Sequence, residues 1–98
     1  MVATTSTGQS APAGQTVPQA PAVRITDVGG TAISRVLVRF RLTEGQGSLN
    51  GGGASVVEEH TNPNGVANLN SWRLGPAGPN TVVASAGSET VEFSAQAT

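Results

Sequence analysis

The segment Val36-Leu-Val-Arg-Phe-Arg-Leu42 decides the fold class of this 98-residue chain. Apolar residues occupy every second position from Val36 to Leu42, and Arg39 and Arg41 lie between them. A period of two places alternate side chains on opposite faces of a β-strand, and β-branched and aromatic residues favour that conformation. We therefore predict a central strand across residues 36–42.

The N-terminal side of this segment also carries a strand pattern. Val23 and Ile25 alternate with polar residues and precede the turn-forming run Asp27-Val-Gly-Gly30. Residues 1–20 are rich in Ala, Thr, Ser, Gly, Gln and Pro, and their prolines exclude a helix or a central strand. We interpret residues 1–20 as a linker and an N-terminal edge strand, and residues 21–98 as one β-domain.

A Gly-rich stretch, residues 45–53, follows the central segment and predicts a long surface loop with Leu49 as its one apolar anchor. Residues 55–61 have β propensity without a clear alternation, so we predict an edge strand there. Asn62-Pro-Asn-Gly65 is a strong turn signal. We expect this turn to join the edge strand to the following strand as a hairpin.

Two segments complete the strand pattern. In residues 66–74 the apolar positions change face before Trp72, so we predict a β-bulge near Asn70-Ser71. Residues 82–86 and 91–95 alternate on either side of Gly87-Ser88 and predict a hairpin. No segment has apolar residues at helical spacing, so we expect almost no helix.

These strands each have an apolar face, and two sheets packed face to face bury such faces most economically. We therefore predict an all-β sandwich of two antiparallel sheets. The predicted structural core consists of the inward-facing residues Val23, Ile25, Val36, Val38, Phe40, Leu69, Trp72, Val82, Val91 and Phe93.

The composition argues against several classes of function. Five basic and six acidic residues give a net charge of −1, too weak a field to hold a nucleic acid or an anionic membrane. The chain has no Cys and no Lys, which excludes disulfides, thiolate metal sites, cysteine nucleophiles and Schiff-base chemistry. No apolar run approaches the roughly 20 residues of a membrane helix. We expect neither nucleic-acid binding nor membrane insertion.

The residues of one short segment are the first candidates for catalysis. His60 is the only histidine, and without a Cys or a second His nearby we interpret it as a solvated strand residue. Glu58 and Glu59 are adjacent, so on a strand they point to opposite faces and cannot form the carboxylate pair of a glycosidase. We predict no catalytic residue.

Calcium is the one metal for which the sequence offers candidate ligands. Asp27, Asn62 and Asn64 offer oxygen ligands of the kind Ca²⁺ prefers, but too few carboxylates accompany them. We predict no metal site and no cofactor.

Arginines and the single Trp are the candidates for binding. Arg24, Arg39 and Arg41 share the outward direction of their strands and could form a stripe for an acidic glycan or a partner's carboxylates. We favour solvated arginines paired with Glu, because Arg on an exposed face also discourages edge aggregation. A surface that stacks against sugars usually needs two or more exposed aromatic rings, and this chain has one Trp and no Tyr. We therefore expect Trp72 in the core near one end.

Most of the chain resembles a known family, the invasin and intimin type of bacterial immunoglobulin-like domain. The resembling stretches are Pro21-Ala-Val-Arg-Ile-Thr-Asp27, residues 36–42, Asn64-Gly-Val-Ala67, and above all Ser71-Trp-Arg-Leu-Gly75 followed by Gly78-Pro-Asn-Thr-Val82. The run Val28-Gly-Gly-Thr31 departs from the family's usual Asn-Gly turn, and Glu58-Glu-His60 is more polar than the corresponding strand. The resemblance implies an immunoglobulin-like β-sandwich with Greek-key connections, used as a spacer or adhesive module outside the cell, and it does not imply an active site.

The expected function is that of a non-catalytic structural or adhesive module in a bacterial secreted or cell-surface protein. As a tandem spacer repeat it would contact neighbouring domains of the same parent protein, and as an adhesive domain it would bind a surface protein or a glycan through its end loops. Two alternatives remain: a subunit that self-associates into a filament when its N-terminal segment adds to a neighbour's sheet, and a ligand- or carbohydrate-binding appendage of a secreted enzyme. An enzyme is the least favoured.

Overall fold

The regular structure of this chain is built from β-strands, as the alternating sequence predicts. The computed structural model describes residues 1–5, 7–50 and 54–98, and these contain strands and no helix, so also no helix able to cross a bilayer. The strands are β1 (Val2–Ala3), β2 (Gly8–Ala11), β3 (Ala22–Arg24), β4 (Leu37–Glu44), β5 (Ser48–Leu49), β6 (Val56–His60), β7 (Val66–Asn68), β8 (Trp72–Arg73), β9 (Gly78–Ala86) and β10 (Glu89–Ala97).

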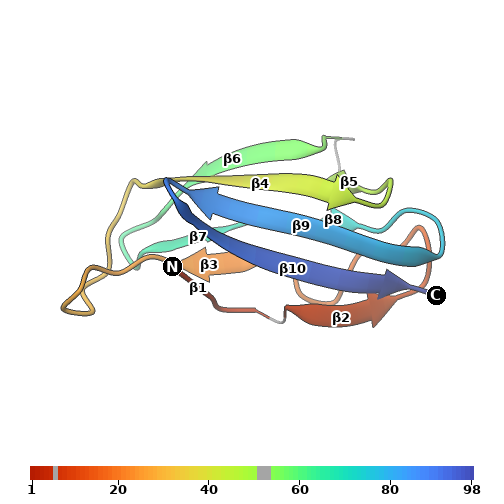
Figure 1. Ribbon diagram of the computed structural model, residues 1–98, viewed down its shortest axis with the longest axis horizontal. Coiled ribbons are helices and arrows are strands. Elements are labelled where there is room, and N and C mark those ends of the chain that lie inside the picture. Colours follow the sequence, from red (N-terminus) through yellow and green to blue (C-terminus); the bar gives the residue numbers. More distant parts are fainter. Residues whose placement is uncertain (6, 51–53) are drawn as a thin grey trace.

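The largest sheet has five strands in the order β2-β10-β9-β4-β6 (Figure 1). Its centre is the predicted C-terminal hairpin, in which β9 and β10 pair antiparallel with Val82 opposite Phe93. The predicted central strand β4 lies between β9 and β6, and β6 is an edge strand as expected. β2 runs parallel to β10, however, so this sheet is not purely antiparallel.

A second sheet of three strands has the order β1-β3-β7 and is antiparallel throughout. The turn at residues 62–65 forms, but the hairpin predicted there is wrong: β6 belongs to the five-stranded sheet and β7 to the three-stranded one. This tight turn therefore passes the chain from one sheet to the other instead of pairing the two strands that it joins.

The described residues form a third sheet of two strands, β5 and β8, where two sheets were predicted, and this sheet corrects two further predictions. The Gly-rich stretch is not one long loop, because it contains β5, although residues 51–53 lie outside the described part of the chain. The bulge predicted near Asn70-Ser71 is replaced by a change of sheet, since β7 pairs with β3 and β8 pairs with β5. The apolar positions change face before Trp72 for this reason.

The hydrophobic core gathers side chains from all three sheets into one cluster. All predicted core residues except Val36 and Val91 are buried, and these two are partly buried and pack against the cluster. Burial also extends to residues that the alternation did not single out as core, among them Ala11, Val17, Leu49 and Leu74. A core shared by facing sheets is consistent with a β-sandwich.

The N-terminal residues take part in both larger sheets. β1 pairs with β3, and β2 pairs with β10, so each forms an edge of a different sheet. The molecule measures 41 × 22 × 21 Å, and its two termini lie toward opposite ends of the long axis (Figure 1).

Candidate functional site

The acidic and imidazole side chains of β6 are spread over both faces of the strand, as the sequence predicts. Glu58 and His60 are exposed, whereas Glu59 is partly buried. Glu58 Oε2 accepts hydrogen bonds from Arg39 Nη2 at 2.9 Å and from Arg39 Nε at 3.2 Å. This exposed ion pair with the cross-strand partner accounts for Glu58, and it matches the solvated interpretation of Arg39.

The arginine stripe considered from the sequence does not form. Arg39 and Arg41 lie on β4 in the five-stranded sheet, but Arg24 lies on β3 in the three-stranded sheet. Arg24 Nε donates to the carbonyl oxygen of Asn64 at 3.3 Å. An acidic glycan would therefore not meet the three guanidinium groups along one surface.

Two of the side chains considered as calcium ligands, Asp27 and Asn62, each stabilise a turn, and the two turns have the same hydrogen-bond pattern. Asp27 Oδ1 accepts from the backbone N–H groups two and four residues ahead, at 2.9 and 3.0 Å, and Asn62 Oδ1 does the same at 2.9 and 3.1 Å. In each turn a glycine with positive φ, Gly30 or Gly65, stands three residues after the side chain. Within the described residues no three acidic or histidine side chains gather around a common point.

Trp72 is fully buried in β8 and contributes the largest side chain of the core. Its indole Nε1–H has no hydrogen-bond acceptor among the described residues. A buried indole of this kind packs but presents no face to a sugar ring, so Trp72 serves the core as predicted.

Asn80 is a buried polar residue that the sequence interpretation did not anticipate. Its side-chain Oδ1 accepts from the Gly75 N–H, and its Nδ2 donates to the Gly78 carbonyl oxygen, both at 3.2 Å. Gly45 has a φ of 88°, and a Cβ there would overlap the Asn80 side chain. Asn80 thus ties the start of β9 to Gly75 by a hydrogen bond, and the backbone at Gly45 packs closely against its side chain.

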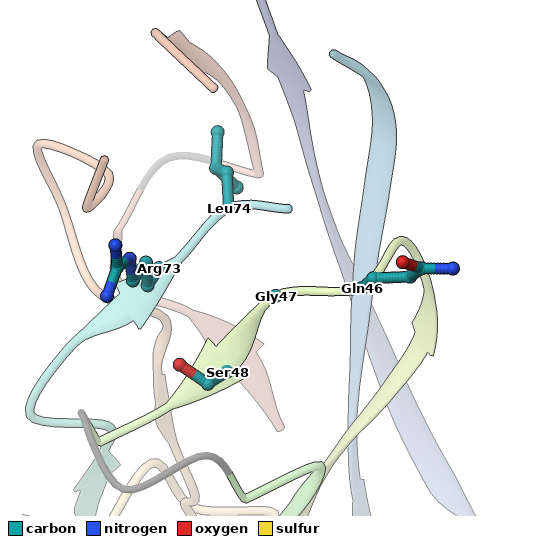
Figure 2. Close-up of a pocket in the computed structure, with 5 residues that line it drawn as sticks. All are labelled: Gln46, Gly47, Ser48, Arg73 and Leu74. Atoms are coloured by element: carbon teal, nitrogen blue, oxygen red, sulfur yellow. The ribbon is translucent and has the colours of Figure 1, made fainter. Parts of the chain in front are cut away.

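A shallow hollow of about 340 Å³ lies beside β5 and β8. The residues that line it are Gln46, Gly47, Ser48, Arg73 and Leu74 (Figure 2). Figure 2 shows the Ser48 and Arg73 side chains leaving their strands toward the same side, while Gln46 points away from them.

The backbones that form this hollow approach each other closely. A Cβ on Gly47 would overlap the carbonyl oxygen of Arg73, and a Cβ on Gly75 would lie 2.8 Å from the Gln46 nitrogen. Only glycine therefore fits at these two positions without a backbone shift. The glycines bring β5 and β8 together and leave the polar side chains of Ser48 and Arg73 on the surface above them.

Arg73 is the functional candidate that the sequence interpretation missed. Its Nε donates to the carbonyl oxygen of Gly14 at 2.8 Å, a contact across 59 residues of sequence. No local pattern marks this position, because a strand of two residues has no period to measure.

No protein-family model matches the chain, and no curated protein and no solved structure gives a significant match to it.

Proposed function

We propose that this chain is an immunoglobulin-like β-sandwich with Greek-key connections that acts as a non-catalytic structural or adhesive module of a bacterial secreted or cell-surface protein. In this role it is one repeat of a tandem spacer, and its main partners are the neighbouring domains of its parent protein.

The order of the strands supports the immunoglobulin-like part of the proposal. In immunoglobulin domains strands A, B and E are neighbours in one sheet, and strands C, F and G are neighbours in the other. The orders β1-β3-β7 and β4-β9-β10 follow this scheme, with β2 and β6 as additional edge strands. The chain changes sheet between β3 and β4 and again between β6 and β7, which is compatible with the Greek-key connections that we propose.

The observation that carries the spacer role is the position of the termini. They lie toward opposite ends of the 41 Å axis, so copies joined end to end extend a stalk instead of folding back on themselves (Figure 1). A domain with both termini at one end would not lengthen a chain of repeats in this way.

The alternative of a filament built by strand addition requires the N-terminal strands to leave their own domain. β1 already pairs with β3 and β2 with β10 of the same chain. Strand addition to a neighbour must therefore break these ladders first, which favours the spacer over the filament.

The test has two parts. Sedimentation of the single chain is expected to give a 9.8 kDa monomer at all concentrations up to the millimolar range. Three copies joined in tandem, studied by small-angle X-ray scattering, are expected to be about three times as long as the 41 Å of one copy. Growth of the single chain into larger assemblies would favour the filament, and a compact three-copy chain would overturn the spacer role.

A further inference from the structure

Three polar side chains form a row beside the hollow at β5 and β8. Arg73 on β8 is the cross-strand partner of Ser48 on β5 and, on its other side, of Thr16. Residues directly opposite each other across strands present their side chains on the same face. Thr16, Arg73 and Ser48, the Arg73 row, therefore stand side by side with Arg73 in the middle, and its Nε contact with Gly14 draws the guanidinium group toward the segment that contains Thr16.

A backbone hydrogen bond orients the guanidinium group of Arg73, but no carboxylate of the described residues balances its charge. Its Nε donates to the Gly14 carbonyl oxygen at 2.8 Å, and no carboxylate of the described residues lies within ion-pair distance of it. Arg73 and Thr16 are exposed and Ser48 is partly buried, and no hydrogen bond to a described residue engages either hydroxyl group. The outer Nη1–Nη2 edge of Arg73 and two hydroxyl groups therefore face solvent together.

This set of donors matches one class of ligand. A guanidinium edge binds a carboxylate through two parallel hydrogen bonds, whereas Ser and Thr hydroxyl groups both donate and accept. A carboxylate held on a ring that also carries oxygen acceptors and hydroxyl groups can pair with all three side chains, and a hexuronic acid combines its carboxylate with a ring oxygen and hydroxyl groups in this way. An acidic peptide carries its carboxylate at the end of a flexible methylene side chain, so no oxygen is held at a fixed position beside the carboxylate for the two hydroxyls.

We propose that the Arg73 row binds the carboxylate of a hexuronic acid residue in an acidic polysaccharide. The hollow, at about 340 Å³, lies at the small end of ligand sites and has room for about one sugar ring. The absence of a side chain on Gly47 lets the backbone before Ser48 approach the Arg73 carbonyl oxygen closely, which holds the two polar residues beside each other. This inference goes beyond the spacer role and does not depend on it, because it holds or fails with the Arg73 row alone.

The experiment is a titration of the full chain with sodium glucuronate and with an oligogalacturonate, followed by amide chemical shifts. We expect saturable shifts centred on the amides of Thr16, Ser48 and Arg73. Sodium acetate, which has a carboxylate without ring hydroxyls, is expected to bind more weakly than glucuronate, and glucose is expected not to bind.

Four variants test whether the row is responsible. Arg73→Gln is expected to weaken glucuronate binding about tenfold or more, and Arg73→Lys to weaken it as well, because Lys keeps the charge but loses the two-pronged contact. Arg41→Gln is the matched control, since Arg41 also lacks an ion pair with described residues but has Val56 and Val83 as cross-strand neighbours. Thr16→Glu places a carboxylate beside the guanidinium and is expected to abolish binding without disturbing the core.

Each outcome decides the proposal. Equal binding of acetate and glucuronate would overturn the saccharide assignment, and an equal loss in Arg41→Gln and Arg73→Gln would reduce the effect to general charge attraction. Unchanged binding in Thr16→Glu would place the ligand elsewhere. Thermal unfolding of each variant, followed by the emission of Trp72, separates a lost site from a lost fold.

Discussion

At the scale of single residues, the close approach of β5 and β8 makes glycine necessary at one position. A Cβ on Gly47 would overlap a backbone oxygen, which cannot move aside as a flexible side chain would. We expect Gly47→Ala to lower the free energy of unfolding by about 2 kcal/mol or more.

The matched control for this substitution is Gly8→Ala. Gly8 lies in β2, and apart from its chain neighbours no other described residue would come within 4 Å of a Cβ at this position, so alanine there should change the free energy of unfolding by less than about 0.5 kcal/mol. Urea unfolding monitored through Trp72 measures both. Equal stability of the two variants would show that β5 can move away from β8 at little cost.

Thr61 is a buried residue whose hydroxyl joins β6 to the segment before β4. Its Oγ1 accepts from the Val36 N–H at 2.9 Å and donates to the Ile33 carbonyl oxygen at 2.7 Å. Thr61→Val keeps the shape but removes these two partly buried hydrogen bonds, so we expect a loss of about 1–3 kcal/mol in unfolding free energy. Thr90→Val, on an exposed position of β10, should lose less than about 0.5 kcal/mol in the same denaturation experiment.

At the scale of elements, the pairing of β4 with β6 includes an ion pair that contributes little to the free energy of unfolding. Arg39 and Glu58 are 57% and 47% exposed, so water screens their attraction. A double-mutant cycle with Arg39→Gln and Glu58→Gln should give a coupling of about 1 kcal/mol or less, falling further in high salt. A cycle between Glu58 and Arg24, which lie on different sheets, should give no coupling, and a strong salt-independent coupling of Arg39 with Glu58 would contradict this view of β6.

The strands also show how much of the fold can be predicted from a single sequence. The alternation predicted β4 and the hairpin of β9 and β10, because each runs for eight or nine residues with one apolar face. β5 and β8 have two residues each, too few for any period to appear. The change of face before Trp72 was visible, but a bulge and a move to another sheet leave the same trace in a sequence.

The candidate binding site was beyond prediction for a related reason. Thr16, Ser48 and Arg73 come from three separate segments, and only the pairing of those segments places them in one row. Each is a common surface residue in its own context. Strand register, which depends on the packing of the whole core, determines their proximity.

At the scale of the whole molecule, residues 1–11 close one edge of each larger sheet. Removing them exposes the outer edge of β10 from Ser94 to Ala97, where β2 pairs with it, and this lengthens the run of unpaired backbone groups that can template pairing with another chain. We expect a chain of residues 12–98 to associate with rising concentration, whereas the full chain remains monomeric in sedimentation.

A peptide of residues 1–11 added in trans provides the control for this truncation. It should occupy the open edge and return the truncated chain to the mass of a monomer, while a peptide of scrambled sequence should not. A truncated chain that stays monomeric at high concentration would show that the edge of β10 is protected by something other than β2.

The parallel pairing of β2 with β10 has a mechanical consequence. A pull on the two ends of the molecule draws β2 backward from Gly8 and β10 forward from Ala97, so the force runs along the ladder and in opposite directions on its two strands. The rungs from Gly8–Ser94 to Ala11–Ala97 are then loaded in shear and must fail together, whereas a hairpin pulled from its open end separates one rung at a time. A repeat with this geometry resists stretching until the whole ladder yields, and a stalk built from such repeats would hold its length under tension and then extend in discrete steps.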